Sequence, residues 1–134
     1  MPKIVWNDSF SVGVETLDEH HKYLAQLINR LSGCASGTTI TEPAVDVISE
    51  LVQYAMYHFH HEEELMAMHN YPDRQKHCGE HTQFCEVVTE TTYGATQGII
   101  DVSHLITYLI RWWENHILHE DMQFKPFFAS VGVK

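Results

Sequence analysis

The sequence is unusually rich in histidine, with 11 histidines in 134 residues against 8 lysines and arginines together. Imidazole is the commonest metal-binding side chain in proteins, so this bias points first to metal ligation. Two spacings stand out, because His58 is four residues before Glu62 and His77 is four residues before His81. Side chains four residues apart lie one above the other on a helix, so each pair could bind one metal ion together.

The elements that would position these pairs are helical, since the surrounding apolar residues recur at threes and fours with no sustained period of two. Glycine, proline and polar clusters divide the chain into an N-terminal extended arm at 1–16 and helices at about 17–32, 42–69, 72–92 and 99–120. A short C-terminal tail follows, closed by Pro126. Helices of this length with short connections predict an all-α protein, an up-down-up-down four-helix bundle that forms one domain over 1–134.

Every predicted helix places ligand-type side chains on its apolar face. The inward positions are His58 and Glu62, His77 and His81, His116 with Asp121 at the frayed end of its helix, and either His20 or His21. Helical spacing alone leaves the choice between His20 and His21 open, since both lie three or four residues from Leu24. Buried polar groups must be paired or bind metal, and one ion takes only about four to six ligands. Seven convergent ligands therefore predict two metal ions bridged by carboxylates.

Composition excludes several other classes. A net charge of −10 would repel phosphate backbones and anionic lipid, so we expect no nucleic-acid and no membrane partner. The sequence has neither a membrane-spanning apolar run nor a signal-peptide core, which favours a cytoplasmic protein. Its three cysteines form no CxxC pair, which argues against a disulfide scaffold or a thiolate zinc site. The HExxH and ferritin-like Glu-x-x-His patterns are absent as well.

From Trp6 to about Phe124, the chain resembles the hemerythrin family, and within it the bacterial hemerythrin-like proteins. The matching stretches are Trp6…Phe10-Ser-Val-Gly-Val14, Leu17-Asp-Glu-His-His-Lys-x-Leu24, His58-Phe-x-x-Glu-Glu-x-x-Met66, Tyr71-Pro-x4-His77-x3-His81-x2-Phe84 and Trp112-x3-His116-Ile-x3-Asp121. All seven positions at which the family places iron ligands hold the expected residue type. The family spacing from Asp18 to Leu24 selects His21 as the first-helix ligand, so His20 would lie behind the ligands or at the surface.

The resemblance implies a non-haem centre of two iron ions, and it divides the ligands between them. One iron would be bound by His77, His81 and His116, and the other, with a vacant position for O2, by His21 and His58. Glu62 and Asp121 would bridge the two irons together with a solvent-derived oxo or hydroxo group. Small anions such as azide would bind at the same vacant position.

An apolar shell is expected around this centre, because it would keep water and protons from the bound ligand. The side chains that flank the ligand stripes are Leu24, Phe59, Trp112, Trp113 and Ile117. The sequence departs from the family at two places. His20 stands where the family usually has Gln, and Trp113 stands where many relatives have Leu.

These features lead us to expect a cytoplasmic monomer that binds O2 reversibly, for transport, storage, scavenging or sensing, and that is not an enzyme. A reductase or signalling partner would remain to be identified. The alternative is a di-iron enzyme acting on peroxide or nitric oxide, or an iron-handling protein such as the related iron–sulfur-cluster repair proteins. Those relatives typically use a more carboxylate-rich site, so the five histidines favour O2 binding. Fold analogy alone does not separate these roles.

Overall fold

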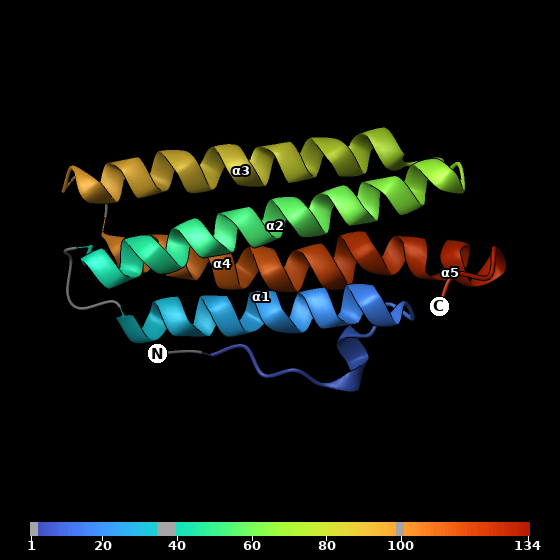
Figure 1. Ribbon diagram of the computed structural model, residues 1–134, viewed down its shortest axis with the longest axis horizontal. Coiled ribbons are helices and arrows are strands. Elements are labelled where there is room, and N and C mark those ends of the chain that lie inside the picture. The colour runs from blue at the N-terminus through green and yellow to red at the C-terminus, as the bar shows by residue number, and fades with distance from the viewer. Residues whose placement is uncertain (1–2, 35–39, 99–100) are drawn as a thin grey trace.

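The computed structural model describes residues 3–34, 40–98 and 101–134, and these residues form a bundle of antiparallel helices (Figure 1). The elements are a 3-10 turn η1 (Asp8–Phe10), α1 (Glu15–Cys34), α2 (Glu42–Met68), α3 (Arg74–Thr96), α4 (Val102–Asn115), a π-helical segment η2 (His116–Asp121) and α5 (Met122–Ser130). Over this part of the chain there are four long helical rods and no strand. The predicted all-α four-helix bundle is therefore confirmed.

Side-chain caps set the start of two of these helices. The Thr41 hydroxyl accepts a hydrogen bond from the Ala44 amide at 3.3 Å, with Pro43 in the first turn of α2. The Asp101 carboxylate accepts one from the Ser103 amide at 3.0 Å, so α4 begins at Val102. The predicted start of this helix at 99 lies outside the described residues, as do positions 1–2 of the predicted arm.

The last rod runs further than the sequence pattern indicates. Instead of fraying at Asp121, it passes through η2 and continues as α5, with Pro126 inside the helix. A proline removes one backbone hydrogen bond and usually ends a helix. Here Phe124 and Phe128 are fully buried and pack near Tyr71, at ring-centroid distances of 6.4 Å each. Burial of these two rings holds the segment helical beyond the proline.

The N-terminal arm lies along α1 and is fixed to it by specific contacts (Figure 1). The Asp18 carboxylate accepts hydrogen bonds from the Val12 amide at 2.9 Å and the Ser11 hydroxyl at 2.6 Å. Further along, the Asn29 side chain exchanges two hydrogen bonds of 2.9 Å with the backbone of Ile4. The arm thus covers one side of the bundle and joins its core.

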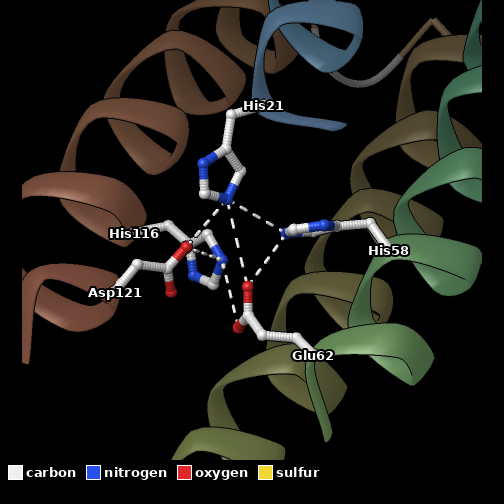
Figure 2. A group of neighbouring side chains, drawn as sticks. All are labelled: His21, His58, Glu62, His116 and Asp121. Atoms are coloured by element: carbon white, nitrogen blue, oxygen red, sulfur yellow. Dashed lines mark hydrogen bonds and ion pairs between the residues drawn. The ribbon is translucent and has the colours of Figure 1, made fainter. Parts of the chain in front are cut away.

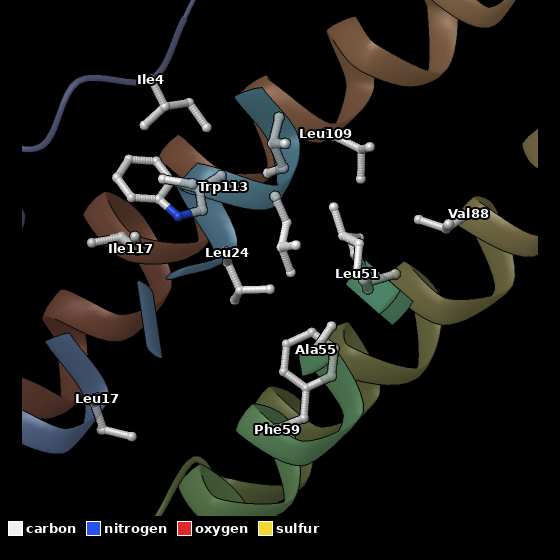
Figure 3. Packing of buried hydrophobic residues seen from close by; sticks show 14 of the residues in the cluster. Ile4, Leu17, Leu24, Leu51, Ala55, Phe59, Val88, Leu109, Trp113 and Ile117 are labelled. Carbon is white, nitrogen blue, oxygen red and sulfur yellow. The ribbon is translucent and has the colours of Figure 1, made fainter. Parts of the chain in front are cut away.

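The core fills the space between the helices with aliphatic and aromatic side chains (Figure 3). Leu24 of α1, Leu51 of α2, Val88 of α3 and Leu109 of α4 are each at most 1% exposed. Close packing of this kind leaves the helices little room to shift relative to one another. It therefore fixes the positions of the polar residues that share these faces. None of the helices in the described part of the chain is long and apolar enough to cross a membrane.

Candidate metal centre

All seven predicted ligand side chains meet at one buried place between the helices, and five of them are drawn in Figure 2. None is more than 4% exposed. They come from every long helix: His21 from α1, His58 and Glu62 from α2, His77 and His81 from α3, and His116 and Asp121 from η2. The convergence predicted from the helical patterns is thus present in the structure.

The ligand atoms form two overlapping groups, and within each group they lie within 4.8 Å of one another. One group contains His21, His58, Glu62, His116 and Asp121, and the other contains Glu62, His77, His81 and His116. Nε2 of His21 is 2.9 Å from a carboxylate oxygen of Asp121, and Nε2 of His58 is 3.1 Å from one of Glu62. Glu62 and His116 belong to both groups, and Glu62, the carboxylate of the two, stands where a bridging carboxylate would stand.

The π-helical segment brings Asp121 to the centre. On an α-helix, five residues turn through about 500°, which would leave Asp121 about 140° away from the face of His116. In η2 the Met122 amide donates to the carbonyl of Ile117, five residues earlier, so the turn is wider. Nε2 of His116 and a carboxylate oxygen of Asp121 then lie 3.1 Å apart. The single wide turn therefore places His116 and Asp121 on the same side of the helix although they are five residues apart.

Hydrogen bonds account for only part of the cluster: His77 is hydrogen-bonded to Glu62, and Nε2 of His21 lies 3.2 Å from Nε2 of His58. Within the described residues, Nε2 of His81, Nε2 of His116, Oε2 of Glu62 and both carboxylate oxygens of Asp121 are buried without a hydrogen-bond partner. Their close pairs satisfy the distance for an ion pair, but the atoms point at a shared centre rather than along donor–acceptor lines. Burying so many unpaired polar atoms is costly unless a cation joins them. The donor set of imidazoles and carboxylates fits divalent transition metals such as iron.

Electrostatic interactions within the cluster favour ionised carboxylates. Burial by itself would raise the pKa of Glu62, but the facing imidazoles outweigh it and hold that pKa well below its usual range. The pKa of Asp121 is also lowered, against the effects of burial and of Glu62, by His116 and His21. Burial lowers the pKa of His58 to about 4, although Glu62 opposes it. Burial would lower the pKa of His77 as well, but the two carboxylates raise it to about 10.

Behind the ligands lies a second layer of polar groups, part of which the sequence pattern did not indicate. Both His20 and His21 are buried, at 5% and 0% exposed, but it is His21 that belongs to a group of candidate ligand atoms. His20 lies behind the centre, with its Nδ1 3.0 Å from Nδ1 of His58. Burial lowers the pKa of His20, and the neighbouring His61 and His21 lower it further.

Glu63 also reaches this second layer. The helical spacing of α2 places Glu63 away from the face that carries His58 and Glu62. Its carboxylate nevertheless lies 3.2 Å from Nδ1 of His81 on α3. A glutamate side chain one position from an inward residue is long enough to contact the next helix. A helical wheel gives the direction of a side chain but not its reach, so the sequence pattern does not predict this contact.

Aromatic rings pack directly on the candidate ligands. The Phe59 ring stacks on His81 at 3.9 Å with an interplanar angle of 9°, and Trp112 stacks on His116 at 4.7 Å and 12°. Trp112 and His116 also line an open cavity of about 240 Å³. Leu24 and Ile117, the two predicted aliphatic wall residues, are at most 1% exposed.

Trp113 is buried and has an additional contact that the sequence pattern did not indicate. Its indole N–H donates to the backbone carbonyl of His21 at 2.9 Å. Its ring meets Phe10 and Trp6 of the arm at centroid distances of 4.9 and 6.3 Å. Trp113 therefore links α4, the ligand-bearing turn of α1 and the arm.

Comparison with known proteins gives consistent matches. The hemerythrin HHE cation-binding domain matches residues 12–128. A bacteriohemerythrin of Stenotrophomonas maltophilia (strain R551-3) is 34% identical over 125 residues, covering 92% of this chain and 80% of the relative. A hemerythrin-like protein of Naegleria gruberi is 31% identical over 121 residues, covering 90% and 89%.

The solved structures agree with the sequence matches. The crystal structure of wild-type hemerythrin superposes with a TM-score of 0.79 at 26% identity, covering 92% of this chain and 95% of that one. A leucine-to-alanine mutant of hemerythrin gives a TM-score of 0.82 at 25% identity, covering 94% and 97%. The chain therefore belongs to the hemerythrin family, whose members bind O2 at non-haem iron.

Proposed function

We propose that this protein binds O2 reversibly at a centre of two iron ions. His77, His81 and His116 would hold one iron and His21 and His58 the other, while Glu62 and Asp121 would be shared between them together with a solvent-derived oxo or hydroxo group. The observation that carries this proposal is the set of buried, unpaired ligand atoms arranged as two overlapping groups. A single ion could not use all seven side chains.

When bound, the iron pair supplies the two electrons that reversible O2 binding requires. The protein holds the ligand rings and excludes water. The stacked rings of Phe59 and Trp112 fix His81 and His116 in orientation. Leu24 and Ile117 are buried and provide an apolar boundary, which limits the protons that could displace a bound ligand. Azide and similar small anions compete for the same place.

We further propose that the protein acts as a cytoplasmic monomer forming one domain. All seven proposed ligands come from one chain, so the centre needs no second copy of it. Its physiological use would be transport, storage, scavenging or sensing of O2, with a reductase or signalling partner. Five imidazoles against two carboxylates support ligand binding rather than turnover. Steady-state assays with peroxide and nitric oxide test this point, and turnover well above that of free iron would favour the enzymatic alternative.

The decisive experiment is anaerobic reduction of the iron-loaded protein followed by exposure to O2. We expect two irons per chain and an O2-dependent visible absorption that reverses when O2 is removed. The His21→Ala variant should lack that absorption, because one iron loses a ligand. One iron per chain, zinc at both positions after iron-replete expression, or an unchanged spectrum in His21→Ala would contradict the proposal.

A further inference from the structure

Both ring nitrogens have a polar neighbour in two of the candidate ligands, His58 and His81. In each, one nitrogen faces the centre and the other faces an outer partner, and the two outer partners differ in charge. Nε2 of His58 lies 3.1 Å from Glu62 in the centre, while its Nδ1 lies 3.0 Å from Nδ1 of His20. Nε2 of His81 lies 3.2 Å from Glu62, while its Nδ1 lies 3.2 Å from the carboxylate of Glu63. One ligand is therefore backed by an imidazole and the other by a carboxylate.

The direction of each outer hydrogen bond follows from metal binding at the inner nitrogen. A ligating nitrogen uses its lone pair, so the ring proton of the ligand lies on the other nitrogen. His58 must then donate its Nδ1–H to Nδ1 of His20, which has to be neutral with its own proton on Nε2. By the same argument, His81 donates its Nδ1–H to the carboxylate of Glu63.

Both acceptors are held in place by their own neighbours. His20 is 5% exposed and is surrounded by the rings of Tyr54, Tyr57 and His61 at centroid distances of 5.7, 5.3 and 5.2 Å. Glu63 is 31% exposed on its side chain and lies near Cys78, where burial and the Glu63 carboxylate raise the pKa of the thiol to about 11. These contacts limit rotation, so each acceptor can fix the orientation of the ring in front of it.

A carboxylate acceptor increases the basicity of the imidazole that donates to it more than a neutral acceptor does. A more basic ligand stabilises the higher charge of the metal. We propose that Glu63 and His20 are positioning residues that make the two metal positions unequal. Glu63, acting through His81, favours the ferric state of the iron that His77, His81 and His116 would hold. His20, acting through His58, orients a ligand of the other iron but adds no negative charge there. This inference rests on the proposed function, which places iron at both positions.

The charge part of the proposal is tested by reduction potentials of the iron-loaded protein. Glu63→Gln keeps an acceptor and removes the charge, so the potential should rise because the ferric state loses stabilisation. Glu64→Gln is the matched control, since Glu64 is 62% exposed, pairs with His60 on the surface and carries the same charge one residue away. Solvent screens that charge, so its removal should shift the potential much less. Equal shifts in the two variants would overturn the proposal.

The positioning part is tested by iron release to a ferrous chelator. His20→Leu leaves the outer N–H of His58 without an acceptor, and release of one of the two irons should become about 10-fold faster or more. His20→Gln supplies a neutral acceptor again and should restore the slow release and the visible spectrum. Equal release from the Leu and Gln variants, or simultaneous loss of both irons, would overturn the role of His20. A parent protein that fails to hold two irons would instead refute the proposed function on which the inference rests.

Discussion

Glu62 is the residue on which the most contacts of the centre converge, because it faces His58 on its own helix and His77 and His81 on the next. A carboxylate shared by two metals matters to both, so Glu62→Ala should lose both irons, whereas His81→Ala should weaken mainly one. Iron counting after gel filtration measures this difference.

The control for this experiment follows from the structure. Glu63→Ala is unsuitable, because Glu63 contacts His81. Glu64→Ala is suitable, because Glu64 is exposed and faces solvent with His60. If Glu64→Ala lost as much iron as Glu62→Ala, the assignment of the inward face of α2 would be wrong.

Trp113 combines packing with one specific hydrogen bond, and two substitutions separate these contributions. Trp113→Phe keeps a ring but removes the indole hydrogen bond to the His21 carbonyl, which keeps its partner within α1, so the cost should be about 0.5–1.5 kcal/mol. Trp113→Leu loses the same hydrogen bond and also leaves a cavity worth about 1–3 kcal/mol, so the loss of unfolding free energy should be larger. The opened space should also speed azide binding and autoxidation, while iron content stays near normal.

Urea unfolding and stopped-flow mixing with azide measure the two effects. Unchanged azide and autoxidation rates in Trp113→Leu would mean that Trp113 is no part of the wall around the centre. Such a result would not affect the assignment of the proposed iron ligands.

At the scale of elements, the sequence predicted the helices well because core burial imposes a repeat of threes and fours on each of them. The candidate ligands were found for the same reason, since His58, Glu62, His77 and His81 share that repeat. Two features depend on more than one helix or on local backbone geometry, and these were not predicted. They are the reach of Glu63 to His81 across the gap between α2 and α3, and the wide turn between His116 and Asp121.

The wide turn leads to a prediction about length. Deleting the exposed residue His119 would place the aspartate four positions after the histidine instead of five. A regular α-helix turns through about 400° over four positions, which brings both side chains close to one face. The variant should therefore keep two irons per chain and gain α-helical regularity. Inserting one alanine after His119 should turn the aspartate away and lose iron. Iron counting and circular dichroism distinguish these outcomes, and iron loss in the deletion variant would show that the π-turn itself is required.

At the scale of the whole molecule, the centre joins all the long helices, so metal binding is coupled to folding. A ligand that binds only the folded state at about 1,000 times its dissociation constant adds about 4 kcal/mol of stability. For a domain of this size, removal of iron by a chelator should lower the melting temperature by about 10 °C. Differential scanning calorimetry of the iron-loaded and metal-free proteins measures the change. Equal melting temperatures would mean that the ligands are not held by metal in the folded protein.

The meeting of α1, α2, α3 and η2 at one buried cluster has a consequence for local opening. Backbone amides exchange with solvent through the smallest motion that exposes them. At the far ends of the bundle each helix can fray alone, so its amides should exchange at their own rates. Around His21, His58, His77 and His116, no turn can open without disturbing the other three. The amides of these four turns, far apart in the sequence, should therefore exchange as one cooperative group with a common free energy of opening.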